Sequence, residues 1–363
     1  MINIAKPIIG DEEINAVINV LKSGNLTSSS KTKSFEENFA KYANSKYAIA
    51  TNSGTAALHA SLLSIGIKEG DEVIVPDFSF VATGSSVAMC GAKPVFADVD
   101  INTYNIDPKS VEKLITSRTK AIIGVHLFGN PFFADELVRI CDENNLYLIE
   151  DSAQAHGATY NNKKTGNIGD VGCFSFYATK NINTAEGGMI TTSNSDISER
   201  VRLIINHGQS TKYTHDILGY NYRLTDICAA IGIEQLKKLE QFNQIRQRNA
   251  KIYDEHLYAK GIIKPRVTDG CKSVYHQYAI RVTDEYGLTR DQLIKYLLDN
   301  GISTAIHYPK PISAQPLFSN LKNPISTPIS KRLSGEILSI PVHPLVTPEE
   351  ILYICDKINE VRK

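Results

Sequence analysis

Between residues 47 and 192, short apolar runs rich in β-branched residues alternate with longer stretches of helical character. This alternation limits the possible folds more than any other feature of the chain. Strands that alternate with helices of about 10–15 residues are typical of an α/β domain with a mostly parallel central sheet. The expected strands are Tyr47–Ala50, Glu72–Val75, Pro94–Phe96, Ala121–Val125, Leu146–Ile149, Cys173–Phe176 and Met189–Thr192.

The pattern changes after Asp226 and predicts a second domain. Residues 227–257 are expected to form one long helix that leads into a smaller C-terminal α+β domain. We therefore place a large domain in residues 1–250 and a small domain in residues 251–363. The total length of 363 residues also favours two domains over one. Outside the sheet we expect helices at 11–23, 34–43, 290–299 and 348–361, a strand at 277–282 and a proline-rich loop at 307–316.

Charge and cysteine usage argue against several classes of function. The 39 basic and 39 acidic residues balance, so no bulk field favours nucleic acid or an anionic membrane. Residues 1–7 lack the apolar core of a signal peptide, and no apolar run reaches the roughly 18–20 residues that a membrane helix needs. The six cysteines show no metal-ligand spacing. We therefore expect a cytoplasmic protein without a disulfide framework, a metal site, or a nucleic-acid or membrane partner.

Two titratable residues follow expected strands of the sheet. Asp151 comes directly after a buried strand, at the edge where α/β sheets place ligands, although it could equally cap the following turn. Lys180 follows the aromatic strand 173–176, and its apolar surroundings would lower its pKa and favour a neutral, nucleophilic amine. The alternative is that Lys180 is exposed to solvent without a catalytic role, which is more common for a lysine after a strand. If both residues face inward, neighbouring strands could bring them to one ligand.

The segment from Asn52 to Leu58 follows the first strand and opens a helix. Small residues and a glycine at a helix N-terminus leave backbone N–H groups free for a phosphate. An ordinary N-cap by Ser53 is the simpler explanation. A third interpretation is that this segment binds the phosphate of a nucleotide in an α/β protein without further cofactor. The chain has no GxGxxG or Walker-type loop to support it.

Taken together, the motifs resemble the DegT/DnrJ/EryC1/StrS group, which are PLP-dependent nucleotide-sugar aminotransferases of fold type I (PLP, pyridoxal 5′-phosphate). The resemblance spans nearly the whole chain and keeps the order of the motifs. The matching pieces are Lys6-Pro7, Ser23-Gly24, Ser53–Leu58, Gly70–Pro76, Glu150–Gly157, Phe174–Asn181, Gly219–Leu224 and His307–Pro309. The block around Lys180 is the most specific of them. The implied fold is a large domain with a mostly parallel sheet between helices, followed by a smaller α+β domain.

The resemblance also implies a role for each residue that matches the cofactor site. Lys180 corresponds to the lysine that holds PLP covalently and transfers protons. Asp151 corresponds to the partner of the pyridine nitrogen, where a fixed negative charge keeps that nitrogen protonated. Gln154 corresponds to the residue against the phenolic oxygen. Phe80 matches the aromatic that stacks on the ring, with a core aromatic as the alternative.

Further residues match the phosphate and substrate sides of the family site. The residues that match the phosphate cup are Gly54, Thr55, Ala56 and Ser175. Asn221 matches a residue that the neighbouring subunit contributes to the phosphate, which implies a homodimer with shared active sites. Four residues lie in segments that line the substrate side in relatives, and each could instead be structural: His156, Arg223, His307 and Tyr308.

The implied reaction is transfer of an amino group from an amino acid, expected to be L-glutamate, to a nucleotide-linked keto sugar. We expect a 4-keto-6-deoxy sugar, and a 3-keto sugar is the alternative. One branch of the family has histidine in place of the lysine and dehydrates the sugar, so Lys180 favours transamination. Ala185 departs from the more frequent glycine of Thr-Gly-Glu-Gly-Gly, which is a small change. A PLP-binding regulatory protein remains possible, although an intact set of Lys180, Asp151 and Gln154 argues against it.

Overall fold

The strands expected between residues 47 and 192 form one seven-stranded sheet in the computed structural model, which describes residues 1–321, 323 and 325–361. Each expected strand is present to within two residues at either end. In spatial order the strands are β1 (Tyr47–Thr51), β9 (Gly188–Thr192), β8 (Val171–Ser175), β5 (Tyr147–Asp151), β4 (Thr119–Val125), β2 (Glu72–Pro76) and β3 (Lys93–Ala97).

The sheet is mostly parallel, as predicted. The β8–β5, β5–β4, β4–β2 and β2–β3 pairs are parallel, whereas β9 runs antiparallel to both of its neighbours. The carboxyl ends of β2, β4, β5 and β8 therefore meet at one edge of the sheet. In α/β proteins this edge is where ligands bind.

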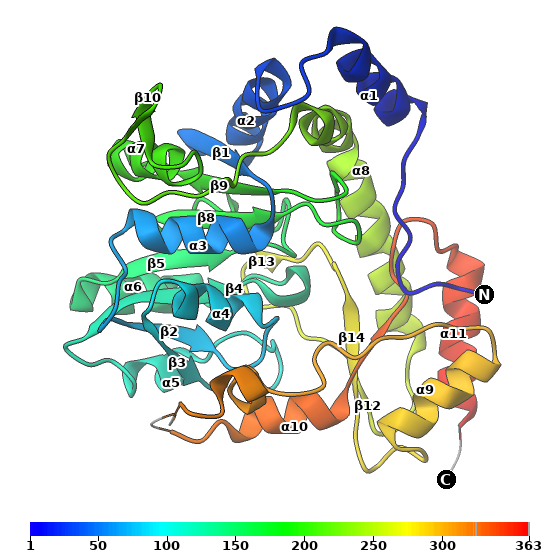
Figure 1. The fold of residues 1–363 in the computed structure, drawn as a ribbon. Coiled ribbons are helices and arrows are strands. Elements are labelled where there is room, and N and C mark those ends of the chain that lie inside the picture. Colours follow the sequence, from blue (N-terminus) through cyan, green and yellow to red (C-terminus); the bar gives the residue numbers. More distant parts are fainter. Residues whose placement is uncertain (322, 324, 362–363) are drawn as a thin grey trace.

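Helices cover both faces of the sheet because successive strand residues point to opposite sides. Val73, Val75 and Ile149 pack into one core, and Ile74 and Leu148 pack into the core on the opposite face. The first face is covered by α3 (Gly54–Ser64), α4 (Ala82–Met89) and α7 (Ser195–Ile204). The opposite face is covered by α5 (Pro108–Glu112), α6 (Ala134–Asn144), α2 (Ser30–Ala43) and part of α8. Figure 1 shows α3 and α4 in front of the strands.

The helix α8 (Asp226–His256, 31 residues) begins at its N-cap Thr225 and runs beside the sheet into the C-terminal part of the chain (Figure 1). There it packs with a separate apolar core around a three-stranded sheet. The elements of this part are β12 (Ile262–Ile263), β14 (Tyr278–Val282), β15 (Ile337–Ile340), α9 (Arg290–Asp299), α10 (Pro328–Glu336) and α11 (Pro348–Glu360). The domain boundary at residue 250 stays a prediction, since α8 runs through it without a break.

The N-terminal segment lies against the C-terminal part, where Ile2 pairs with Ile302. The following helix α1 (Asp11–Ser23) packs on α8, and the Lys238 ammonium donates to the buried Glu13 carboxylate. The remaining short elements are the hairpin of β10 (Gln209–Thr211) and β11 (Thr214–His215), the small sheet of β6 (Thr159–Tyr160), β7 (Lys163–Lys164) and β13 (Cys271–Lys272), and 3₁₀ turns at Leu127–Gly129, Ile312–Ala314 and Pro316–Phe318. Within the described residues, no helix has both the length and the apolar composition to cross a bilayer.

Candidate active site

A cavity of about 350 Å³ opens at the carboxyl ends of the strands, between the sheet and the C-terminal part of the chain. It brings together most of the residues predicted from the sequence. From the expected cofactor site it is lined by Gly54, Thr55, Phe80, Asp151, Gln154, Ser175 and Lys180. From the expected substrate side it is lined by His307 and Tyr308, and Thr179, Glu186, His276 and Gln277 are additional polar residues of the wall.

Asp151 is the last residue of β5 and is 6% exposed. Its Oδ2 accepts a hydrogen bond from the Thr83 hydroxyl at 3.1 Å, and its Oδ1 accepts one from the Ala153 N–H at 3.2 Å. Burial raises the pKa of this carboxyl, and these two hydrogen bonds and the charge of Lys180 act in the opposite direction. A cation at the cavity end of Asp151 would therefore stabilise its charged form. Thr83 was not predicted, because nothing in its local sequence indicates that it reaches Asp151.

Lys180 lies in the turn after β8, where its backbone N–H donates to the Tyr177 carbonyl at 2.9 Å. Burial lowers the pKa of its ammonium to about 8, and the negative charge of Asp151 partly opposes that shift. A lysine with this pKa has a substantial neutral fraction near neutral pH, and the neutral amine is the nucleophile that attacks an aldehyde. Burial is the main cause of the shift, as expected from the sequence.

The far end of the cavity is the N-terminus of α3. Ser53 is its N-cap and accepts a hydrogen bond from the Ala56 N–H at 3.1 Å, so the simpler explanation of this motif is also correct. The Ala56 N–H is engaged there, whereas Gly54 and Thr55 supply the first two N–H groups, which precede the helical ladder. A side chain at Gly54 would lie 2.7 Å from Ser175 Cβ, so glycine is needed where the two loops meet.

Gln154 is held in one orientation by two partners. Its Oε1 accepts from the Phe128 N–H at 2.7 Å, and its Nε2 donates to the Tyr308 hydroxyl at 3.0 Å. Phe80 lies beside the same tyrosine, with 6.1 Å between the ring centroids. Phe80 is 54% exposed, so it is not a core aromatic. Phe80 also lines the cavity.

Two histidines on the small-domain side are held neutral. His307 Nδ1 lies 2.9 Å from the Ser339 hydroxyl, and burial together with the nearby charge of Lys180 lowers its pKa to about 4. His276 Nδ1 lies 3.1 Å from Asn181 Oδ1, and burial lowers its pKa well below the usual value. His276 lies far from Lys180 in sequence, and no motif marks it. In the described part of the chain, no cluster of His, Cys, Asp and Glu is arranged to hold a metal ion.

Four predicted residues do not line this cavity: Ala56, His156, Asn221 and Arg223. The N–H of Ala56 donates to the Ser53 side chain. His156 is fully buried between Phe174 and Phe176, where burial lowers its pKa to about 3. The Arg223 guanidinium donates to Asn206 Oδ1 at 2.7 Å. Asn221 is exposed, and its backbone carbonyl accepts from the Asn52 side chain at 3.3 Å. The chain therefore does not deliver Asn221 or Arg223 to its own cavity.

Comparisons with known proteins agree with the fold. Residues 7–359 match the model of the DegT/DnrJ/EryC1/StrS aminotransferase family. The chain is 37% identical to the GDP-perosamine synthase of Caulobacter vibrioides, with 99% of this chain and 98% of that protein covered. It is 39% identical to the dTDP-3-amino-3,6-dideoxy-alpha-D-galactopyranose transaminase of Aneurinibacillus thermoaerophilus, with 96% and 95% covered.

A solved structure of Spr1654 from Streptococcus pneumoniae, in its PLP form, superimposes with a TM-score of 0.93. The two chains are 29% identical, and the match covers 99% of this chain and 98% of that one. The predicted fold class, the aminotransferase activity and the PLP cofactor are thereby confirmed. The chain belongs to the DegT/DnrJ/EryC1/StrS family of aminotransferases.

Proposed function

We propose that this enzyme transfers the amino group of L-glutamate to the keto carbon of a nucleotide-linked sugar in two half-reactions. The observation that carries the proposal is the pairing of Lys180 with Asp151 across one cavity. They come from the neighbouring strands β8 and β5, and each influences the pKa of the other. Groups whose environments shift their pKa values in this way are typical of catalytic sites.

The residues of the cavity fit PLP by their chemistry. Bound PLP supplies an electron sink for the carbon that loses its proton. Asp151 is a buried carboxylate that accepts from the neutral donors Thr83 and Ala153, and it supplies the negative charge that a protonated pyridine nitrogen needs. Gly54 and Thr55 at the start of α3 and the Ser175 hydroxyl supply donors for the phosphate. Lys180 holds the cofactor through Nζ and then moves the proton at the reacting carbon.

The sugar side of the site is proposed to include His307 and Tyr308. Both line the cavity opposite the strand ends, and His307 is neutral at physiological pH. A neutral imidazole and a phenol can each donate and accept hydrogen bonds, as a hydroxyl-rich sugar requires. His156 is not included in this proposal, because its ring is fully buried against two phenylalanines and does not line the cavity.

We further propose a homodimer in which Asn221 of one subunit completes the phosphate site of the other, with Arg223 nearby. Asn221 is exposed and does not line the cavity of its own chain. Close by in sequence, Tyr213 and Leu218 are 82% and 80% exposed, and contact with a second subunit would bury them. Figure 1 shows that the β10 hairpin projects from the body of the molecule.

The expected acceptor is a 4-keto-6-deoxy sugar, with a 3-keto sugar as the alternative. The two relatives above carry GDP and dTDP in their names, and one name specifies a 3-amino product, so the test must vary both features. The enzyme should first be mixed with glutamate alone, which should release one equivalent of 2-oxoglutarate per site. The aminated enzyme is then offered GDP- and dTDP-linked 4-keto and 3-keto sugars, with mass spectrometry of the product.

A 4-amino product formed faster than any 3-amino product supports the proposal as stated. Preference for a 3-keto sugar selects the alternative. If 2-oxoglutarate is released and no nucleotide sugar is aminated, the acceptor class is wrong. Binding of PLP without any half-reaction would instead favour a regulatory protein.

A further inference from the structure

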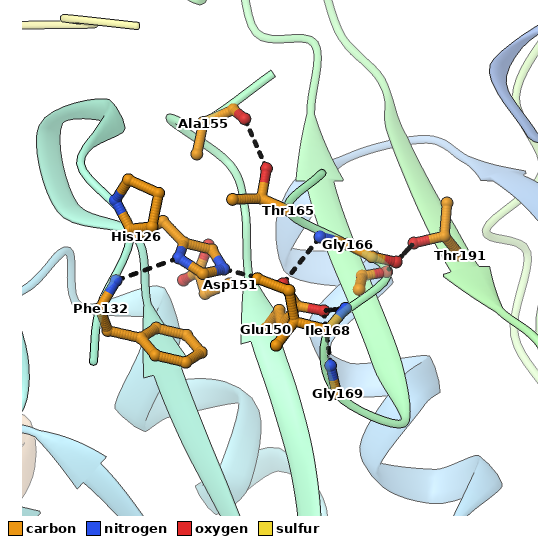
Figure 2. Close-up of polar contacts among 12 residues, drawn as sticks. His126, Phe132, Glu150, Asp151, Ala155, Thr165, Gly166, Ile168, Gly169 and Thr191 are labelled. Atoms are coloured by element: carbon orange, nitrogen blue, oxygen red, sulfur yellow. Dashed lines mark hydrogen bonds and ion pairs between the residues drawn. The ribbon is translucent and has the colours of Figure 1, made fainter. Parts of the chain in front are cut away.

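Glu150, the residue before Asp151 on β5, is fully buried, yet it does not line the cavity. Its carboxylate accepts four hydrogen bonds. Oε2 accepts from His126 Nε2 at 2.9 Å and from the Gly166 N–H at 2.8 Å, and Oε1 accepts from the N–H groups of Ile168 at 2.7 Å and Gly169 at 2.9 Å. A buried carboxylate needs this many donors to offset the loss of water. Figure 2 shows the donors converging on it.

His126 joins β4 to two successive residues of β5. Its backbone N–H donates to the Asp151 carbonyl at 3.1 Å, while its ring reaches Glu150. Its Nδ1 lies 3.4 Å from the Phe132 N–H and so acts as the acceptor, which leaves Nε2 as the donor to Glu150. The ring also stacks on Phe132, with 4.2 Å between centroids. His126 therefore has little freedom to move without moving Asp151.

The three backbone donors belong to the loop 165–169, which is also attached to the segment after Gln154. The Thr165 hydroxyl donates to the Ala155 carbonyl at 2.6 Å, and the Thr191 hydroxyl donates to the Gly166 carbonyl at 2.6 Å. Gly166 has φ +85°, and a Cβ there would lie 2.4 Å from the Phe174 ring. The loop is therefore fixed between Glu150, the 152–157 segment and β9 (Figure 2).

We propose that Glu150 and His126 are positioning residues, which hold Asp151 and Gln154 in place against the cofactor ring. Adjacent strand residues face opposite sides of a sheet, so Glu150 anchors β5 from the α6 side while Asp151 faces the cavity. The proposal rests on the proposed roles of Asp151 and Gln154. It extends the site to a layer that touches neither cofactor nor substrate.

A purely structural role is the competing explanation, and the chain contains a matched control. Glu72 on β2 is also buried, at 3% exposed, and accepts from Thr116 Oγ1 at 2.7 Å, Arg118 Nη2 at 2.8 Å and Lys93 Nζ at 3.2 Å. It lies at the start of its strand, away from the cavity. Glu72→Gln should therefore lower stability without disturbing Asp151.

The test compares wild type, Glu150→Gln, His126→Phe and Glu72→Gln. For each we would measure the melting temperature of the apoprotein, the dissociation constant of PLP, the pH dependence of the bound cofactor's absorbance, and single-turnover release of 2-oxoglutarate. All three variants should melt earlier. Only Glu150→Gln and His126→Phe should slow the single turnover, by tenfold or more at saturating PLP. In these two variants the absorbance transition of the ring should move to lower pH, because a displaced Asp151 no longer favours the protonated nitrogen.

If Glu150→Gln retains the wild-type single-turnover rate and absorbance profile and loses only stability, as Glu72→Gln does, the positioning role is wrong. Should Glu150→Gln fail to fold, His126→Phe decides alone, because it keeps the three backbone donors and the stacked ring. Failure of the underlying function would look different. Wild type and Glu72→Gln would then also fail to bind PLP or to release 2-oxoglutarate.

Discussion

The Gln154 side chain donates to the Tyr308 hydroxyl at 3.0 Å and thereby joins the loop after β5 to the C-terminal part of the chain. The same side chain accepts from the Phe128 N–H, so its amide cannot rotate without losing a hydrogen bond. The Gln154 side chain is therefore fixed from both sides of the cavity wall.

We expect Tyr308→Phe to cost about 1 kcal/mol of unfolding free energy, which is the usual net value of one hydrogen bond. Combined with Gln154→Leu, the losses should be less than additive, because both variants remove the same contact. Urea denaturation of the apoprotein in a double-mutant cycle measures the coupling. Additive losses would mean that the hydrogen bond contributes nothing in solution.

The rate at which the apoprotein captures PLP should rise with pH, with a midpoint near the Lys180 pKa of about 8. Below this value the amine is protonated and cannot attack the aldehyde. Because the charge of Asp151 raises the pKa of Lys180, Asp151→Asn should move the midpoint to lower pH. Stopped-flow absorbance between pH 6 and 10 gives the profile. A midpoint close to 10.5, the ordinary lysine value, would show that Lys180 is solvated in the apoprotein.

Asp151→Asn should keep the fold and much of the PLP affinity, but it should slow the half-reaction with glutamate by orders of magnitude. The loss corresponds to about 3–4 kcal/mol, the size reported for other preorganised electrostatic contacts. The cause is loss of the charge that keeps the ring nitrogen protonated. Single-turnover kinetics measure the effect on the rate, and a parallel PLP titration measures the effect on cofactor affinity. Near-normal kinetics would indicate that Asp151 only caps the following turn.

Mixing inactive Lys180→Ala chains with inactive Asn221→Asp chains should restore activity after subunit exchange. In a hybrid dimer with shared sites, one active site contains both substitutions and the other active site contains neither. Up to one site in every hybrid dimer should then turn over. Native mass spectrometry checks that exchange took place. Hybrids that form and remain inactive would show that Asn221 serves its own subunit or harms the fold.

The sequence predicted the parts of the fold that have strong local patterns. Continuous apolar runs marked the seven strands, and helix α9 was predicted at its observed bounds, Arg290–Asp299. The β10–β11 hairpin and the small β6–β7–β13 sheet were missed, because strands of two or three residues carry no detectable periodicity. Helix α10 and strand β15 were likewise not predicted.

For the site, the sequence predicted residues that lie inside recognisable motifs, such as Asp151 and Lys180. It did not predict Thr83, His276 or the link between Gln154 and Tyr308. These contacts join segments that are far apart along the chain, so only the tertiary fold brings them together. Glu150 stood within a matching motif, but its four partners come from His126, which follows β4, and from the loop 165–169.

The most direct test of the account is to find which lysine carries the cofactor. The enzyme loaded with PLP should be reduced with borohydride, digested and mapped by mass spectrometry, with Lys180→Ala as the control. We predict a single labelled peptide, with the label on Lys180, and no label in the variant. A label on any other lysine of the wild-type protein would contradict the proposed site and the mechanism built on it.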